Sequence, residues 1–183
     1  MLQHRRFFAN FANLRENSFV LNIIQAESDD QIDDARRLFR EYESWHGMDL
    51  CFQDYEREVA ELPWKYVKPE GRLLLALVDD KLAGCIAMRK LEDGICEMKR
   101  LFVRDGFRGQ HVGVSLIEKL IAEARAEGYL KMRLDTFPPK MGKAVSLYES
   151  HGFRPIPAYY HNPHVGALFM ELELLKGCSP ERS

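Results

Sequence analysis

The chain has 183 residues, a length typical of one domain, and 46% of them are hydrophobic, so it can form a core without a metal or a disulfide. Its net charge of −2 argues against a general affinity for nucleic acid or for a membrane surface. No apolar run approaches the roughly 18 residues that a transmembrane helix requires, so the sequence predicts a soluble globular protein.

The first predicted element follows an N-terminal segment without a clear structural pattern. Residues 1–17 lack the continuous apolar run and the small-residue cleavage site of a secretion signal, so we interpret them as an N-terminal extension. Residues 18–27 (SFVLNIIQAE) are rich in β-branched and apolar side chains and are bounded by polar turn residues. This pattern predicts a buried strand.

Two helices are predicted next. Ser28 or Asp29 can cap a helix whose apolar residues recur at helical spacing as far as His46, and Gly47 is suited to end it. Residues 52–66 (FQDYEREVAELPWKY) predict a second, shorter helix, because a proline interrupts the pattern near its end.

Three consecutive strands are predicted after these helices. The runs 72–80 (RLLLALVDD) and 81–93 (KLAGCIAMRKLED) meet at a pair of aspartates that suits a hairpin turn. The run 94–105 (GICEMKRLFVRD) follows another turn, which contains Gly94. Strands joined by such short turns form an antiparallel meander.

The hydrophobic period changes to that of a helix after Gly109, and Gly128 ends this helix. Residues 129–137 then predict a strand, which lies parallel to the preceding strand because a helical crossover connects the two. A helix at about 142–150 and two further strands, the last at 166–174, complete the order.

This order, β-α-α-β-β-β-α-β-α-β-β, predicts an α/β fold in which helices flank a mixed sheet. No internal repeat or low-complexity linker divides it, so we assign one domain to residues 18–175 and a polar C-terminal tail to residues 176–183.

The four cysteines have no zinc-ligand spacing. Cys85 and Cys96 lie within apolar strand patterns, whereas Cys51 and Cys178 do not. Buried free thiols are the interpretation that we favour, and they suit the reducing environment of the cytoplasm.

The segment from Arg104 to Gly113 (RDGFRGQHVG) joins a predicted strand to the N-terminus of a long helix. Unpaired amides and the helix dipole favour anions there, and Arg108 adds a permanent positive charge. We therefore expect a phosphate-bearing ligand. The segment is neither a Walker loop, since no GK[ST] follows, nor a dinucleotide GxGxxG loop, since the glycine spacing differs and the preceding strands are antiparallel.

The pattern R-G-x-x-x-G at 108–113, followed by helix, strand and helix, resembles the GNAT superfamily of N-acetyltransferases. The runs MKRLFV (98–103), LDT (134–136) and AVSLYESHGF (144–153) resemble the family's central strand, its neighbouring strand and its late helix. The resemblance extends from residue 18 to 174. It implies the GNAT fold, with an antiparallel meander, a splayed parallel strand pair and flanking helices. The sequence departs from the family pattern at His111, where a glycine is usual.

The resemblance implies acetyl-CoA as co-substrate, with its pyrophosphate on the amides of Arg108 to Val114 and its pantetheine arm along the backbone of Leu101 and Val103. The implied cofactor-binding residues are Leu101, Phe102, Val103, Arg108, Gly109, Gln110, His111, Val112, Gly113 and Val114. We expect His111 to lie on the first helical turn, where the backbone needs no positive φ, so that its amide donates while its ring points away.

Acetyl transfer requires a neutral amine, a hydrogen-bond donor to the oxyanion and a proton donor to the leaving thiolate. Tyr148 matches the family position of that proton donor; the alternative is a core aromatic whose hydroxyl bonds to the backbone. Glu97 matches, by its offset along the strand, a catalytic glutamate of some members. Three interpretations of Glu97 stay open: a base acting through water, a contact to the substrate ammonium, or a cross-strand ion pair with a lysine or arginine. The nearby cations Lys99 and Arg100 strengthen the ion-pair interpretation.

Residues 157–166 (PAYYHNPHVG) form a loop rich in tyrosine and histidine. In the family this loop commonly borders the acceptor. Its candidate acceptor contacts are Tyr159, Tyr160 and Asn162. His161 and His164 have no third ligand nearby, so we predict no metal site.

The leading hypothesis is an acetyl-CoA-dependent N-acetyltransferase of the cytoplasm, in which a primary amine attacks the thioester directly. A small molecule or an amino acid is favoured over a protein as acceptor. The alternative is a CoA or acyl-CoA sensor, or a catalytically degenerate scaffold, which His111 favours and Tyr148 opposes. We expect no nucleic-acid or membrane partner, and the resemblance implies a homodimer as one oligomeric state.

Overall fold

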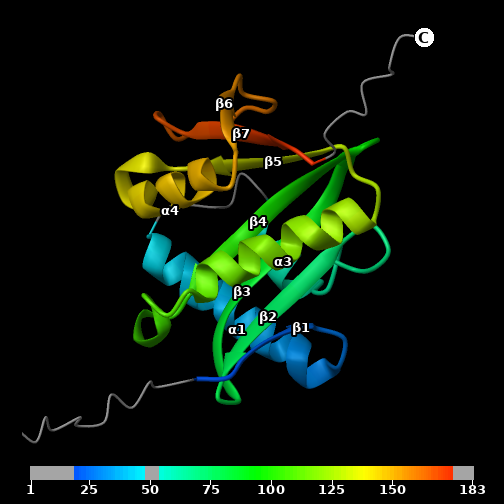
Figure 1. Cartoon of the computed structure of the whole chain (residues 1–183), viewed down its shortest axis with the longest axis vertical. Coiled ribbons are helices and arrows are strands. Elements are labelled where there is room, and N and C mark those ends of the chain that lie inside the picture. Colours follow the sequence, from blue (N-terminus) through cyan, green and yellow to red (C-terminus); the bar gives the residue numbers. More distant parts are fainter. Residues whose placement is uncertain (1–18, 48–53, 175–183) are drawn as a thin grey trace, which may run out of the picture.

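The structure, a computed structural model, describes residues 19–47 and 54–174 (Figure 1). The N-terminal extension, Cys51, Cys178 and the C-terminal tail lie outside these residues. The elements are β1 (Leu21–Gln25), α1 (Asp29–His46), α2 (Tyr55–Ala60), β2 (Arg72–Val78), β3 (Lys81–Glu92), β4 (Ile95–Val103), the 3-10 turn η2 (Asp105–Phe107), α3 (Val112–Ala126), β5 (Lys131–Thr136), α4 (Pro138–Ser150), β6 (Arg154–Ile156) and β7 (Leu168–Glu173).

The described strands form one sheet in the order β1-β2-β3-β4-β5-β7-β6. The first four make an antiparallel meander, β4 and β5 are parallel, and β7 pairs antiparallel with both β5 and β6. The predicted mixed sheet, the antiparallel meander and the order of helices and strands are thereby confirmed.

Apolar side chains cover both faces of this sheet. Ile86 and Met88 of β3 point into a core that includes the apolar side of α3, while Cys85 and Ala87, alternating with them, point into a core formed with α1 and α2. Figure 1 shows α3 on one face of the sheet and α1 on the other. The strands that carry the candidate site are therefore held from both sides.

Local sequence explains where the helices begin and end. Ser28 caps α1 through the amide of Gln31, whose side chain accepts from the amide of Ser28 in return, and Gly47 ends the helix in a left-handed conformation (φ 58°). The helix α4 begins at Pro138, earlier than the predicted residue 142, because prolines are tolerated in a first helical turn; non-helical backbone at Met141 marks a kink.

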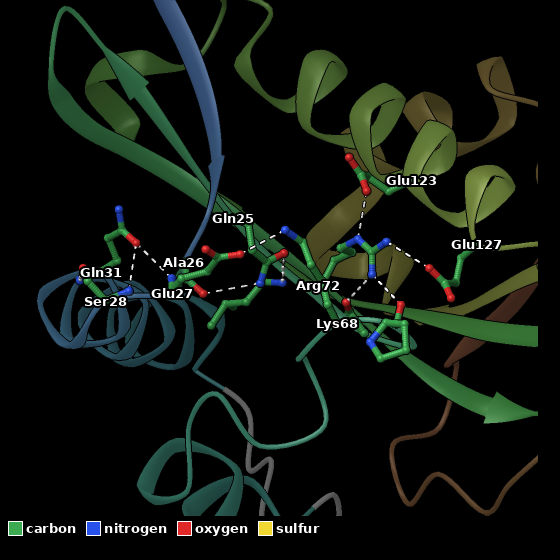
Figure 2. A network of polar contacts seen from close by, with 12 residues as sticks. Gln25, Ala26, Glu27, Ser28, Gln31, Lys68, Arg72, Glu123 and Glu127 are labelled. Carbon is green, nitrogen blue, oxygen red and sulfur yellow. Dashed lines mark hydrogen bonds and ion pairs between the residues drawn. The ribbon is translucent and has the colours of Figure 1, made fainter.

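Arg72 fixes α3 against the start of β2 (Figure 2). Its side chain is buried, with Nε donating to Glu123 (2.9 Å) and Nη2 to Glu127 (3.2 Å), both on α3. Nη1 donates to the carbonyl oxygens of Pro69 (2.5 Å) and Gly71 (2.7 Å). A buried guanidinium with this many acceptors is well compensated, so α3 is anchored at the end away from its N-terminus.

The strands β4 and β5 pair over only three residues each. Ile95, Cys96 and Glu97 lie opposite Lys131, Met132 and Arg133, and the ladder then ends. Figure 1 shows β5 turning away from β4 beyond this point. This divergence, which confirms the predicted splayed pair, leaves the edge of β4 from residue 99 to 103 without a partner strand among the described residues.

Candidate active site

The loop between β4 and α3 offers a run of unused backbone donors. The amides of residues 109–114 have no hydrogen-bond acceptor among the described residues, whereas the amide of Arg108 donates to the Asp105 carbonyl (3.2 Å). The donors available to an anion, expected from Arg108 to Val114, therefore run from Gly109 to Val114. They surround the N-terminus of α3, where the helix dipole favours negative charge.

His111 differs from its expected conformation. It has φ 59° and ψ 7°, in the left-handed region, and it is the N-cap of α3 rather than a residue of the first turn. The expectation that this position needs no positive φ was wrong, because α3 begins one residue later, at Val112, and His111 turns the chain into the helix. Histidine is one of the few residues other than glycine that adopt this conformation with some frequency.

The Arg108 side chain already has partners. Nε donates to the Val103 carbonyl (3.1 Å), Nη1 lies 2.6 Å from Asp105, and the guanidinium lies 5.0 Å from the centre of the Trp45 ring. Trp45, at the end of α1, in turn lies 6.3 Å from the Phe102 ring. An anion at this loop would compete with Asp105 for a guanidinium that is 43% exposed.

The N-terminus of α3 lies close to both β4 and α4. A Cβ atom added to Gly113 would be 3.7 Å from Val103 Cγ2 and 3.9 Å from Leu147 Cδ2. Tyr148, the next residue on α4, is only 4% exposed, and its ring packs edge-to-face on Phe153 at 5.8 Å. Three elements that the sequence separates thus converge near the divergence of β4 from β5.

The hydroxyl of Tyr148 has no hydrogen-bond acceptor or donor among the described residues, so the alternative of a hydroxyl tied to the backbone is not what the structure shows. Burial, followed by the proximity of Tyr42 and the charge of Asp135, raises the pKa of Tyr148 above its ordinary value. The phenol therefore keeps its proton well above neutral pH.

Glu97 is buried, with an exposure of 1%, and its carboxylate is fully engaged. Oε2 accepts from Arg89 Nε (2.8 Å), with Arg89 Nη2 at 2.7 Å, and Oε1 accepts from the Tyr159 hydroxyl (2.9 Å). Lys99 Nζ is more distant, at 3.8 Å. The ion pair that the sequence left open is present, but its main partner is Arg89, which lies directly opposite Glu97 in the β3–β4 register.

Lys99 bridges the two diverging strands. Its buried Nζ lies 3.0 Å from Asp135 Oδ1, and Asn162 Nδ2 donates to Oδ2 at 3.3 Å. Burial alone would raise the pKa of Asp135, but Lys99 and the hydrogen bond from Tyr160 outweigh burial and hold it below its ordinary value. Asp135 is therefore a carboxylate at neutral pH. It was not among the site residues predicted from the sequence, although it lies in the LDT run.

The loop after β6 contacts the carboxylates of Glu97 and Asp135. Tyr159 bonds to Glu97 and Tyr160 to Asp135, and both rings pack on Phe169 at 5.1 Å. The candidate acceptor contacts Tyr159, Tyr160 and Asn162 are thus brought to the same face as Glu97 and Asp135. No group of three or more histidine, cysteine or acidic side chains suited to a metal occurs in the described part of the chain.

Arg100, which was a possible partner of Glu97, pairs with Glu58 of α2 instead. Its Nε and Nη2 bond to the two carboxylate oxygens at 2.8 and 2.7 Å, and Tyr66 donates to the same carboxylate (2.7 Å). Arg100 has φ 59° at a shift in the β3–β4 register. This bulge directs the side chain toward α2, and nothing in the sequence marked it.

The remaining features are structural. Cys85 and Cys96 are buried free thiols, as predicted, and burial raises the pKa of Cys96 to about 12. His151 follows α4, with Nδ1 2.8 Å from the Leu147 carbonyl.

None of the helices in residues 19–47 and 54–174 has the length and apolar character needed to cross a membrane.

Known proteins resemble this chain in both sequence and fold. Residues 32–153 match the model of the acetyltransferase (GNAT) family. An uncharacterised N-acetyltransferase of Schizosaccharomyces pombe is 41% identical over 147 residues, which cover 79% of this chain and 90% of that protein. Another from Dictyostelium discoideum is 30% identical, covering 85% and 99%. The human N-acetylaspartate synthetase is 33% identical over 106 residues, covering 57% of this chain and 35% of that protein.

Solved structures share the fold at lower identity. A GNAT acetyltransferase of Staphylococcus aureus superposes with a TM-score of 0.71 at 20% identity, covering 85% of this chain and 100% of that chain. An N-acetyltransferase of Thermoplasma acidophilum, solved in complex with coenzyme A, superposes with a TM-score of 0.66 at 17% identity, covering 84% and 99%. The family match, the relatives and the sheet order agree, and the chain belongs to the GNAT family of N-acetyltransferases.

Proposed function

We propose that this protein transfers the acetyl group of acetyl-CoA to the primary amine of a small molecule, by direct attack of the amine on the thioester. The observation that carries the proposal is the Tyr148 hydroxyl, which is buried, protonated and without a partner among the described residues. Buried polar groups are normally satisfied, so an unpaired hydroxyl beside the divergence of β4 and β5 suggests a ligand that completes it.

Acetyl-CoA fits the donors that surround this place. The free amides of Gly109 to Val114 would hold its pyrophosphate, with Arg108 exchanging Asp105 for a phosphate oxygen. The unpaired edge of β4 at Leu101 and Val103 would bind the pantetheine amides as an added strand does. The coenzyme A complex of the Thermoplasma structure supports this choice of co-substrate.

The transfer requires protons to leave the amine and a proton to reach the thiolate. The ammonium of the acceptor first loses one proton to water. Attack then forms the N–C bond and breaks the C–S bond; the nitrogen loses its second proton to water, while Tyr148 gives its proton to the leaving thiolate and takes one back from water. The amide of Leu101 or Val103 is our candidate donor to the oxyanion. Glu97, proposed from the sequence as catalytic, has both oxygens occupied, so we assign it to positioning Arg89 and Tyr159.

The acceptor would lie against the loop after β6. Tyr159, Tyr160 and Asn162 bring polar groups to the divergence and fill space there with packed rings, which favours a small acceptor over an extended polypeptide. The name of the human relative, N-acetylaspartate synthetase, indicates acetylation of an amino acid.

The alternative of a coenzyme A sensor loses its main support. His111 has the left-handed backbone conformation that a glycine adopts easily, and its amide has no acceptor among the described residues. The histidine therefore leaves the loop amides available to an anion. Two measurements separate the hypotheses: release of free CoA thiol from acetyl-CoA with a panel of primary amines, and calorimetric binding of CoA. We expect turnover with at least one amine. Tight binding without turnover on any amine would favour the sensor.

A further inference from the structure

Four charged residues form a row of alternating sign across four neighbouring strands. Arg89 of β3 lies opposite Glu97 of β4, which lies opposite Arg133 of β5, which lies opposite Glu171 of β7. Residues opposite each other in a sheet share a face, and this is the face away from α3, since Met132 and its neighbours pack on the α3 side. The row marks the last level at which β4 and β5 pair.

Each of the two arginines of this row has N–H groups that make no hydrogen bond within the described residues. Arg89 uses Nε and Nη2 on Glu97, and Arg133 uses Nε on Glu171 (2.7 Å) and Nη1 on Glu92 (2.6 Å). Neither Nη1 of Arg89 nor Nη2 of Arg133 donates to an acceptor within the described part of the chain. The side chains are 21% and 19% exposed, so a ligand can reach them.

Aromatic rings hold both guanidinium groups in place. Arg89 lies 5.6 Å from the centre of the Trp64 ring, and Arg133 lies 5.5 Å from that of Tyr159. Tyr159 also donates to Glu97, so it connects the two halves of the row. Guanidinium groups oriented in this way, with free N–H groups, are suited to bind a carboxylate.

A second charged pair lies two residues closer to the diverging ends of the strands. Lys99 and Asp135 follow Glu97 and Arg133 by two positions each and form an ion pair at 3.0 Å. At about 3.3 Å per residue, this pair is about 6.6 Å beyond the row. Such a separation suits a small molecule that carries a carboxylate at one end and an amine at the other.

Resting on the proposed function, we infer that the acceptor is an amino acid, whose carboxylate binds the free N–H groups of Arg89 and Arg133 and whose amine lies toward Asp135. The carboxylates of Glu97, Asp135 and Glu171 are each paired with a cation of the protein. A polycationic amine would therefore find none of these three acids unpaired, whereas an acceptor carboxylate finds unused donors. Arg89 and Arg133 are thus specificity-determining residues.

The test compares amino acids with their primary amides and with the amines formed by loss of the carboxyl group. The full chain is assayed for CoA thiol release from acetyl-CoA. We expect kcat/KM to be at least about tenfold higher for the amino acid than for its amide, which corresponds to about 1.4 kcal/mol. The amide is a stringent comparison, because a larger fraction of its less basic amine is neutral at pH 7, so a preference for the amino acid would not arise from easier deprotonation.

Arg133→Gln supplies the discriminating variant, with Lys131→Gln as its control. Both residues contact Glu171, and each leaves the other as its partner, so neither change strands a buried carboxylate. Arg133→Gln should lower kcat/KM for the amino acid at least tenfold, mainly through KM, and leave the amide unaffected. Lys131→Gln should preserve the preference for the amino acid.

Two results would overturn the inference alone: equal or better turnover of the amide or the decarboxylated amine, or the same loss in Arg133→Gln for substrates with and without a carboxylate. Absence of turnover with every amine, despite binding of acetyl-CoA, would instead overturn the proposed function and the inference with it.

Discussion

At the scale of single residues, Tyr148 and His111 matter most to the proposed reaction. Tyr148 is a buried phenol whose hydroxyl has no partner among the described residues, and His111 is a histidine in a backbone conformation typical of glycine. Each would cost free energy in an ordinary core or helix terminus. In the proposed complex, acetyl-CoA offsets both costs. Its sulfur accepts a hydrogen bond from the Tyr148 phenol, and its pyrophosphate accepts hydrogen bonds from the loop amides, including that of His111.

Tyr148→Phe removes the proposed proton donor and little else. We expect kcat to fall by about 10² to 10⁴, as is typical when a general acid is lost, with affinity for CoA within about twofold. The free energy of unfolding should not decrease, because no hydrogen bond within the described residues is lost. Steady-state kinetics, calorimetry and urea unfolding measure these quantities. An unchanged kcat would show that another group protonates the thiolate.

The raised pKa of Tyr148 predicts the shape of the pH profile. The donor acts in its protonated form, so activity would be lost as pH rises through its pKa. Burial moves that pKa above the ordinary value of 10. The rate with a simple amine should therefore rise as the amine deprotonates and show no fall up to about pH 10. A decline starting near pH 8 would contradict the assignment.

His111→Gly tests whether the imidazole contacts the co-substrate. Glycine adopts φ 59° without strain, so we expect CoA affinity to change by less than about tenfold, or about 1.4 kcal/mol. His111→Val is the matched variant: a β-branched residue is strained at this φ, so it should weaken CoA binding by more than tenfold. Calorimetry measures both. A loss above tenfold in His111→Gly would make the imidazole part of the site.

At the scale of elements, β4 organises the site because of the bulge at Arg100. The bulge turns Arg100 toward α2, while Glu97 and Lys99 point toward Arg89 and Asp135. Arg100 and Glu58 then form a buried ion pair that joins α2 to the central strand. Such a pair fixes geometry rather than adding much net stability, but losing one partner leaves an uncompensated charge.

Glu58→Gln should therefore destabilise the fold by about 3 to 5 kcal/mol at pH 7. Burial alone would raise the pKa of Glu58, but Arg100 outweighs burial and holds the pKa below its ordinary value. A lowered folded-state pKa contributes stability that is complete above the unfolded-state pKa of about 4.3 and is lost as the pH falls through the folded-state value. The wild type should lose stability below about pH 4.5.

Urea unfolding at several pH values checks this expectation. Glu58→Gln should show a shallower loss below pH 4.5 than the wild type, since its side chain has no proton to gain. The control is Glu61→Gln, which removes only an exposed helical pair with Arg57 and should change little. The same acid dependence in Glu58→Gln as in the wild type would show that other carboxylates cause it.

At the scale of the whole molecule, the sequence predicted the order of elements but not the partners of the charged residues. Hydrophobic periodicity and turn residues depend on local chemistry, so the strands and the ends of α1 were recognisable. The pairing of Glu97 with Arg89 depends on the register of β3 and β4, which shifts between Lys90 and Glu92, close to the turn that joins the two strands. Asp135 lies two residues beyond the last residue of β5 that pairs with β4. Its place beside Lys99 therefore depends on how the two strands diverge, which the sequence does not show.

The structure of the complex with CoA tests the account most directly. We predict the pyrophosphate at the amides of Gly109 to Val114, the pantetheine along the free edge of β4, and the sulfur within about 3.5 Å of the Tyr148 hydroxyl. The amide protons of the loop should also be protected from exchange when CoA is bound. A complex with CoA bound away from this loop, or with the sulfur out of reach of Tyr148, would contradict the account.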